Sequence, residues 1–240
     1  MNSKPIIVVG GEPYSVFLEI FFKSIKKVNL KKPIILIASK KLTLLQMKKL
    51  GFNFEINMID ENDDMFNLLC DKKINLIDVN FKFNKVFDKI TDKSNSYISK
   101  SFQVALKILK EKECSGLING PISKKHFLNG KNLGITEYLA QKTLKKNKVA
   151  MLIFNKKLSV SPITTHLALK DVHKNISKQK IYIHIKLIAE FYKKNFKRIP
   201  KIAITGLNPH CESNFKDCEE GATIIPAIKS LKAQKFKVEG

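Results

Sequence analysis

Short apolar runs alternate with amphipathic stretches along this chain of 240 residues, and this alternation limits the possible folds more than any other feature. A short apolar run bounded by turn residues is typical of a strand buried in a parallel sheet. Apolar residues spaced three and four positions apart predict a helix with one buried face. We therefore predict an α/β fold in which helices cover a largely parallel sheet.

The individual elements follow from the same two patterns. Strands are predicted at residues 5–9, 33–38, 54–59, 74–79, 116–119, 149–154, 158–162 and 201–205, with a further strand from Val238. Helices are predicted at residues 14–27, 40–50, 96–113, 135–144, 178–196 and 217–233. Ser39 is the expected N-cap of the second helix and Gly51 its stop. Residues 155–157 are expected to join two of the strands as a hairpin.

Lysine dominates the charge of the chain. Lysine and arginine together number 44 against 21 acidic residues, a formal net charge of +23, and Arg198 is the sole arginine. Such a balance first suggests a nucleic-acid binder. Recognition of bases and phosphates depends heavily on the guanidinium fork of arginine, however, and the lysines here are spread along the whole chain. We therefore expect no nucleic-acid partner.

Four cysteines, Cys70, Cys114, Cys211 and Cys218, occur without a CxxC pair. No secretory signal precedes them, so they are expected to be free thiols in a reducing compartment. A zinc site that combines the last two with the nearby His210 is an alternative. No stretch approaches the roughly 20 apolar residues that a membrane span needs. These features predict a cytoplasmic protein with no membrane partner.

Two of the five histidines occupy similar places in the sequence. His166 follows the predicted strand 158–162, and His210 follows the predicted strand 201–205. Because ligands of open α/β sheets bind beyond the carboxyl ends of strands, these imidazoles could share one divalent metal. Two unrelated loop histidines are the alternative. The other three are expected to be structural, with His184 in the core and His126 and His173 at the surface or at helix caps.

Two turn segments are candidates for binding an anion or a substrate. Residues 116–124 (GLINGPISK) predict a strand, a Gly-Pro turn and a helix start, where Lys124 adds positive charge. Thr136 and Glu137 lie in the first turn of the predicted helix 135–144. A plain turn and an ordinary helix cap are the alternatives. GxGxxG after the first strand, GxxxxGKS/T and GxSxG are all absent, so a standard dinucleotide, nucleoside-triphosphate or hydrolase site has no support.

Five short motifs follow one another along the chain. They are residues 10–20 (GGEPYSVFLEI), 119–124 (NGPISK), 134–140 (GITEYLA), 164–172 (TTHLALKDV) and 206–210 (GLNPH), the last followed by Glu219-Glu220 and residues 224–231. Together they resemble the 4-hydroxythreonine-4-phosphate dehydrogenase family of pyridoxal 5′-phosphate biosynthesis, and GLNPH is the most specific of them. The resemblance extends from Pro5 to Gly240.

The resemblance implies a three-layer α/β/α fold like that of isocitrate and isopropylmalate dehydrogenases. We expect a first lobe at residues 1–125 and a second lobe at residues 126–240 that carries the metal histidines. The resemblance also implies a homodimer with its active site at the subunit interface, NAD as cofactor, and a divalent metal such as Zn²⁺, Mg²⁺, Co²⁺ or Mn²⁺. The family's third histidine ligand falls beyond Gly240, so we expect the chain to be truncated at its C-terminus.

Individual site residues are carried over from the family motifs. His166 and His210 match two of the three metal ligands, Thr136 matches a substrate-binding residue, and Lys124 is a further candidate near an anionic group. Ile135 occupies the position of a substrate-binding histidine in the family. Because an aliphatic side chain cannot donate a hydrogen bond, this departure leaves the substrate open. No residue is assigned as the catalytic acid or base.

The activity implied by the resemblance is the oxidation and decarboxylation of 4-phosphooxy-L-threonine to 3-amino-2-oxopropyl phosphate, with hydride transfer to NAD⁺. A dehydrogenase of another phosphorylated 3-hydroxy acid, such as threonate or erythronate phosphate, is one alternative. A metal-dependent lyase or hydrolase that uses the same histidines without NAD is another. An inactive fragment is the third.

Overall fold

The computed structural model describes residues 4–28, 32–61, 67–130, 134–143, 148–208, 211 and 218–240. The chain forms two compact units, Met1–Ile135 and Thr136–Gly240. The lobes expected at residues 1–125 and 126–240 stay a prediction, because units defined within one chain do not show where the lobes of an assembled enzyme meet.

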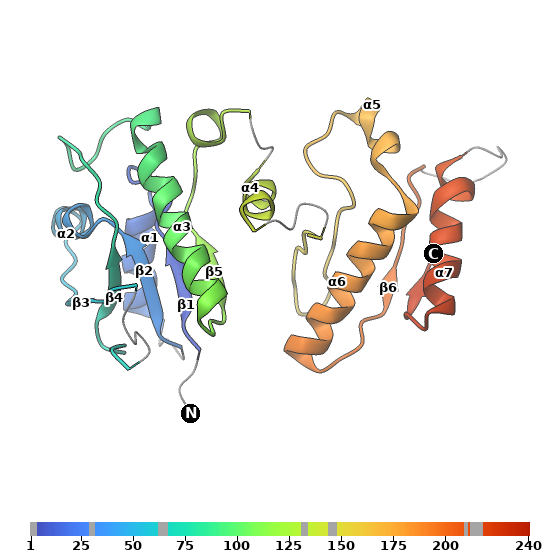
Figure 1. Cartoon of the computed structure of the whole chain (residues 1–240), viewed down its shortest axis with the longest axis horizontal. Coiled ribbons are helices and arrows are strands. Elements are labelled where there is room, and N and C mark those ends of the chain that lie inside the picture. Colours follow the sequence, from blue (N-terminus) through green and yellow to red (C-terminus); the bar gives the residue numbers. More distant parts are fainter. Residues whose placement is uncertain are drawn as a thin grey trace. The chain divides into compact units, whose positions relative to one another are not determined.

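A five-stranded parallel sheet forms the centre of the first unit (Figure 1). Its strands, in spatial order, are β3 (Ile56–Met58), β4 (Ile74–Asp78), β2 (Ile34–Ala38), β1 (Ile6–Val9) and β5 (Gly116–Asn119). The chain moves outward from β1 through β2 and then returns to place β5 on the other side of β1. This reversal makes the carboxyl ends of β1 and β5 a topological switch point, the place where open α/β sheets bind ligands.

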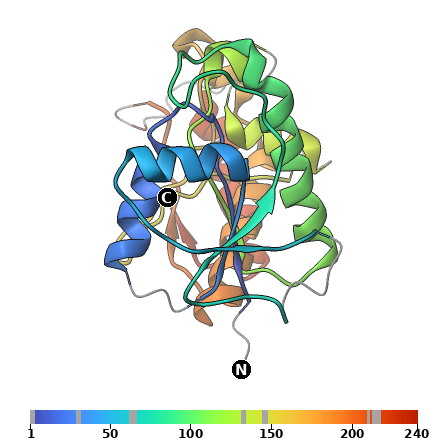
Figure 2. The same ribbon diagram turned by 90° about the vertical axis from the view of Figure 1, so that its left-hand side faces the viewer.

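Helices cover both faces of this sheet. On one face, α1 (Phe17–Lys27) and α2 (Lys40–Lys49) pack against β-strand residues such as Leu36, and Phe22 is fully buried between these layers. On the other face, α3 (Asn95–Glu111) packs against β1 and β2. Figure 2 shows α1 and α3 on opposite sides of the sheet. The predicted three-layer α/β/α arrangement is therefore confirmed for this unit.

Local sequence signals set the ends of α2. The Ser39 hydroxyl accepts a hydrogen bond from the Leu42 N–H at 3.4 Å and caps the helix as predicted. Gly51 follows the helix with a φ of +72°, a left-handed conformation that glycine adopts at helix ends without steric cost. Because β1 and β2 are parallel, the loop after β2 lies on the same edge of the sheet as the loop after β1.

The second unit is built around two packed helices and one short pair of parallel strands. Its helices are α4 (Ile135–Lys142), which begins at the unit boundary, α5 (Leu169–Val172), α6 (Lys178–Phe196) and α7 (Ile225–Ala233), and its strands are β6 (Ile202–Ala203) and β7 (Val238–Glu239). The core joins α6 to α7, where Ile181 and Ile185 pack in one cluster with Ile228, Leu231 and Val238. Short helical turns in the two units are η1 (Asp92–Ser94), η2 (Lys124–Leu128), η3 (His173–Asn175) and η4 (Glu220–Ile224).

The predicted hairpin in the second unit is reduced to a single pair of residues. Ile153 and Val160 exchange two backbone hydrogen bonds of 2.8 and 3.0 Å as one antiparallel bridge, and residues 149–154 and 158–162 form no regular strands. The prediction of two strands is wrong because apolar residues alone do not make a ladder. Ile153 is 61% exposed and Val160 is 54% exposed, so neither is held by a buried layer.

The predicted helix at residues 217–233 is also altered. Asp217 lies outside the described residues, and the described part begins as the π-helical turn η4 before α7 continues from Ile225. Pro226 lies in the first turn of α7 and has no N–H to donate, which fits a change of hydrogen-bond register at this point.

The expectations of no membrane-spanning helix and no disulfide bond can be compared with the described residues. No helix in the described part of the chain combines the length and apolar character that crossing a membrane requires. The four cysteines are free thiols, as predicted.

Candidate functional site

Two loops pack closely at the carboxyl ends of β1 and β5. The Gly120 N–H donates to the Val9 carbonyl at 2.7 Å, and the Glu12 N–H donates to the Pro121 carbonyl at 2.8 Å. A Cβ atom on Gly11 would overlap the backbone of Gly120 and Pro121, and Gly11 has a φ of +71°. The glycines after β1 therefore serve the contact between the two loops. Their space is taken by the chain's own backbone, and they offer no cradle for a pyrophosphate group.

Glu12 is a buried carboxyl group that the sequence patterns did not single out. Its side chain is 2% exposed, and neither carboxyl oxygen has a hydrogen-bond partner among the described residues. Burial raises the pKa of Glu12 above its ordinary value, and the Ser94 side chain and His126 oppose this shift only in part. An acidic residue that follows a buried strand and two glycines at a switch point is the sequence signal that could have found it.

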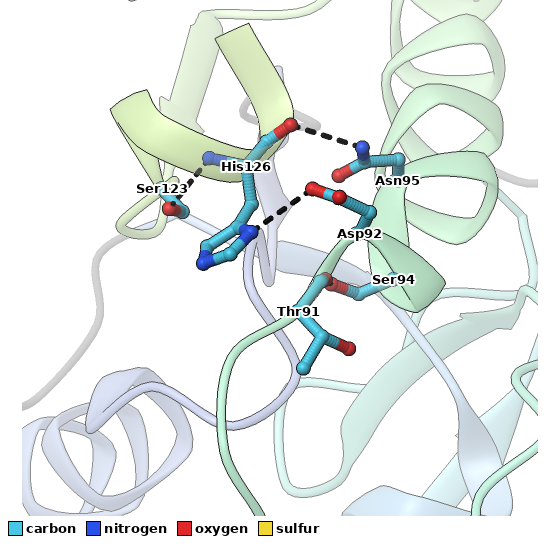
Figure 3. A network of polar contacts seen from close by, with 6 residues as sticks. All are labelled: Thr91, Asp92, Ser94, Asn95, Ser123 and His126. Atoms are coloured by element: carbon cyan, nitrogen blue, oxygen red, sulfur yellow. Dashed lines mark hydrogen bonds and ion pairs between the residues drawn. The ribbon is translucent and has the colours of Figure 1, made fainter. Parts of the chain in front are cut away.

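A polar network fixes η2 to the start of α3 (Figure 3). The His126 Nδ1 atom lies 2.9 Å from Asp92 Oδ1, and Asn95 Nδ2 donates to the His126 carbonyl at 3.0 Å. The His126 N–H donates to the Ser123 hydroxyl at 3.1 Å, which caps η2. His126 is therefore structural, as expected, but it is half-buried and pairs its imidazole with a carboxylate, while Ser123 caps the turn.

Lys124 is the first residue of η2 and is exposed. Its ammonium group has no partner among the described residues, and the network around His126 fixes the helical turn that carries it. The segment can present positive charge at the end of β5. Nothing in the described contacts assigns an anion to it, so its role stays a prediction.

The first turn of α4 contacts the loop that carries His166. Thr165 Oγ1 donates a hydrogen bond to Glu137 Oε1 at 3.2 Å, across 28 positions of sequence. Ile135 and Thr136 lie in the same turn and are half-buried, and the Thr136 hydroxyl has no partner in the described chain. The sequence placed Glu137 in this turn only as a helix cap, so its contact with Thr165 is new.

His166 has an unusual backbone conformation for a residue with a side chain. Its φ is +56°, in the left-handed region that residues other than glycine seldom adopt. The side chain is exposed and forms no hydrogen bond with any described residue. Its imidazole nitrogens are therefore available to a ligand, and a neutral imidazole is a common ligand of divalent transition metals.

The loop that leads to His210 is tied to η4 by a buried carboxylate. Glu220 is 3% exposed and accepts hydrogen bonds from the Asn208 N–H at 2.8 Å, the Leu207 N–H at 2.9 Å and Asn208 Nδ2 at 2.9 Å. These bonds, led by the one from the Asn208 N–H, lower the pKa of Glu220 to about 2. A Cβ on Gly206 would overlap the Cys211 thiol, so the chain folds back closely onto itself here.

The second predicted ligand, His210, lies outside the described residues. Within the described ranges, no group of three or more His, Cys, Asp or Glu side chains is placed to hold a metal ion together. His166 is thus one free imidazole that fits a metal ligand, and Glu220 holds Leu207 and Asn208, which precede His210 in the sequence. His184 is 6% exposed on α6, and burial lowers its pKa, so the expectation of a core histidine is confirmed.

Comparison with known proteins decides the family. Residues 29–240 match the model of the family described as "Pyridoxal phosphate biosynthetic protein PdxA". The chain is 34% identical over 238 residues to the 4-hydroxythreonine-4-phosphate dehydrogenase of Sulfurihydrogenibium sp. strain YO3AOP1, covering 97% of this chain and 72% of that relative. This chain belongs to the PdxA family.

Other members of the PdxA family show the same coverage. The 4-hydroxythreonine-4-phosphate dehydrogenase of Aquifex aeolicus strain VF5 is 28% identical and is covered over 74% of its length. A protein of Clostridium botulinum strain Hall, provisionally named D-threonate 4-phosphate dehydrogenase, is 30% identical and is covered over 73% of its length. The chain thus spans about three quarters of the length of these relatives. Like them, it is an oxidoreductase, a dehydrogenase of a family named for pyridoxal phosphate biosynthesis.

Solved structures agree on the fold. The chain superposes on a 4-hydroxythreonine-4-phosphate dehydrogenase from Klebsiella pneumoniae with a TM-score of 0.83 at 24% identity, covering 99% of this chain and 74% of that one. A 4-hydroxythreonine-4-phosphate dehydrogenase from Burkholderia phymatum gives a TM-score of 0.82 at 23% identity. The predicted α/β fold is therefore that of the PdxA enzymes.

Proposed function

We propose that this chain carries out the NAD-dependent, divalent-metal-dependent oxidation and decarboxylation of 4-phosphooxy-L-threonine to 3-amino-2-oxopropyl phosphate. The substrate loses a hydride from C3 and a proton from its 3-hydroxyl group, and the resulting 3-keto acid loses carbon dioxide. The observation that carries the proposal is the hydrogen bond between Glu137 and Thr165 in a PdxA-family chain. It joins the motif that contains Thr136 to the motif that contains His166.

His166 and His210 are the residues that would hold the divalent metal. A bound metal polarises the oxygen atoms of a hydroxy acid and stabilises negative charge that develops on them. The His166 imidazole is suited to this role because it is exposed and has no partner among the described residues. Glu220 restrains Leu207 and Asn208, which precede His210 in the sequence.

Thr136 and Lys124 are the proposed substrate contacts. The Thr136 hydroxyl can both donate and accept a hydrogen bond, and no described residue competes for it. The exposed Lys124 ammonium group can pair with an anionic group of the substrate. In the family the active site lies at a subunit interface, so we also propose a homodimer. A cytoplasmic location is proposed separately, because free cysteines are typical of a reducing compartment.

NAD has no standard binding motif in this chain. The backbone of Gly120 and Pro121 fills the space beside Gly11, so a pyrophosphate group does not fit at the turn after β1. NAD is proposed from the family alone, and we assign no residue to it. The cofactor supplies the acceptor for the hydride that leaves C3.

A second candidate substrate is D-threonate 4-phosphate, which has a hydroxyl group where 4-phosphooxy-L-threonine has an amino group. One observation favours it, since a relative of that name is 30% identical. Ile135, which stands where the family resemblance places a substrate-binding histidine, leaves the choice between the two substrates open. Replacement Ile135→His should restore a hydrogen-bond donor and raise kcat/KM for the preferred substrate about 10-fold. The preferred substrate is identified by measuring kcat/KM for both substrates with the parent and with Ile135→His. Equal kcat/KM values for the two proteins would rule out a substrate contact at position 135.

The proposed function is tested by the formation of NADH from each substrate with added Co²⁺ or Mn²⁺. The variant His166→Ala should lower kcat/KM about 100-fold or more, because it removes a group that acts on the reacting oxygen atoms. The matched control is His173→Ala, which removes another exposed histidine in η3 and should leave kcat/KM unchanged. Turnover in His166→Ala equal to that of the control would contradict the assignment.

A further inference from the structure

Glu137 ties the His166 loop to α4 through a polar contact. Its Oε1 atom accepts the hydrogen bond from Thr165 Oγ1 at 3.2 Å, and Thr165 directly precedes His166. Both residues lie in the second unit, and Glu137 is held in the first turn of a helix. The contact therefore connects a rigid element to the residue before the free imidazole.

The conformation of His166 needs such a restraint. A non-glycine residue in the left-handed region persists where its surroundings hold it there. The His166 side chain is exposed and makes no described hydrogen bond, so it does not hold itself in place. The restraint must come from its neighbours, and the Thr165 hydroxyl is the adjacent group with a fixed partner. On the other side of Thr165, Ile163 packs against the apolar core of α6 and α7.

The second carboxylate oxygen of Glu137 can accept a hydrogen bond that no described residue donates. Oε2 is buried and has no hydrogen-bond partner among the described residues. A buried carboxylate oxygen without a donor is costly, and native structures seldom leave one unpaired. Histidines that bind metals commonly have a carboxylate close by that accepts a hydrogen bond and fixes the ring. A spare acceptor beside the His166 loop fits this arrangement.

We propose that Glu137 is a positioning residue for metal binding: it holds Thr165, and through Thr165 it fixes His166 in the orientation that binds the ion. The inference rests on the proposed function, because it takes His166 as a ligand. Glu137 itself is not a catalytic residue. It lowers the cost of ordering the loop when the metal binds, so its loss should appear as weaker metal affinity.

The test is the affinity of the whole 240-residue chain for Co²⁺, measured by calorimetry on purified variants. Glu137→Ala and Thr165→Val each remove one side of the hydrogen bond and should weaken Co²⁺ binding about 10- to 100-fold. Glu137→Gln keeps a carbonyl acceptor and Thr165→Ser keeps the hydroxyl, so both should bind within about 3-fold of the parent. Glu190→Ala, which removes an exposed glutamate on α6, is the control and should bind like the parent.

A double variant shows whether the two residues act together. Glu137→Ala with Thr165→Val should bind Co²⁺ no more weakly than either single variant, because the second change removes a contact that is already lost. Additive losses would overturn the inference, and so would parent-like binding by both single variants. If Glu137→Ala does not fold, the pair Thr165→Val and Thr165→Ser decides the matter, since equal binding by these two excludes the hydroxyl contact.

His166→Ala separates failure of the inference from failure of the proposed function. Loss of Co²⁺ binding in His166→Ala with parent-like binding in Glu137→Ala would overturn the positioning role alone. Parent-like binding in His166→Ala would overturn both the ligand assignment and the inference.

Discussion

The buried carboxyl group of Glu12 makes a specific prediction about stability and pH. Glu12 is 2% exposed, and neither oxygen has a partner among the described residues. Burial raises its pKa in the folded protein above the ordinary value of 4.5, so the folded state binds this proton more tightly than the unfolded chain. Stability from Glu12 is therefore fully present below pH 4.5 and is lost as the pH rises toward the folded-state pKa.

The size of the effect follows from the linkage of one proton. Between the unfolded and folded pKa values, the free energy of unfolding falls by at most about 1.4 kcal/mol per pH unit. Two other groups act in the opposite direction. Burial lowers the pKa of His184, so its contribution to the free energy of unfolding rises with pH up to about 6.5. The pKa of Glu220 is lowered to about 2, so its contribution to the free energy of unfolding rises with pH between about 2 and 4.5. The contribution of Glu12 must therefore be measured as the difference in the free energy of unfolding between the parent and a variant that lacks this carboxyl group.

The variant Glu12→Gln provides that difference, because glutamine has nearly the same shape and does not titrate. Unfolding in urea should be followed by circular dichroism, since the chain has no tryptophan, at several pH values from 4 to 8. The stability of Glu12→Gln relative to the parent should increase above pH 4.5, with a slope of up to about 1.4 kcal/mol per pH unit. Parallel pH profiles for the two proteins would refute the raised pKa.

Two further predictions concern packing. Phe22→Ala should lower the free energy of unfolding by about 3–5 kcal/mol in urea titrations, because Phe22 is fully buried, whereas Phe87→Ala, at 45% exposed, should change it by less than about 0.5 kcal/mol. Gly120→Ala should cost about 1–3 kcal/mol in the same titrations, because its methyl group would overlap the Gly10 carbonyl. Gly51→Ala, which meets open space and loses only its favoured positive φ, should cost about 1 kcal/mol. Equal stability of parent and Gly120→Ala would show that the two loops are not closely packed.

The fold was predictable where one physical signal dominated. The apolar run of β5 (Gly116–Asn119) and the helical spacing of apolar residues in α6 (Lys178–Phe196) predicted the observed bounds of both elements. The hairpin was overpredicted because Ile153 and Val160 are apolar but exposed, and a sequence does not show whether an apolar residue meets a partner layer.

The candidate site was predictable only in part. Motifs predict Thr136 and His166 as site residues one at a time, and these stay predictions. The contact between Glu137 and Thr165 spans 28 positions and depends on the tertiary fold. The burial of Glu12 has the same origin, because it arises from the packing of the loops after β1 and β5. Charge and spacing do not report such contacts, and a folded chain is needed to find them.

The central claim is that His166 and His210 support a metal-dependent oxidation. The most direct measurement is NADH formation from 4-phosphooxy-L-threonine and from D-threonate 4-phosphate by the parent, His166→Ala and His210→Ala, with and without Co²⁺. The account predicts Co²⁺-dependent NADH formation from one of these substrates by the parent, and a loss of about 100-fold or more in both variants. NADH formation that is independent of Co²⁺, or that persists at the parent's rate in both variants, would contradict it.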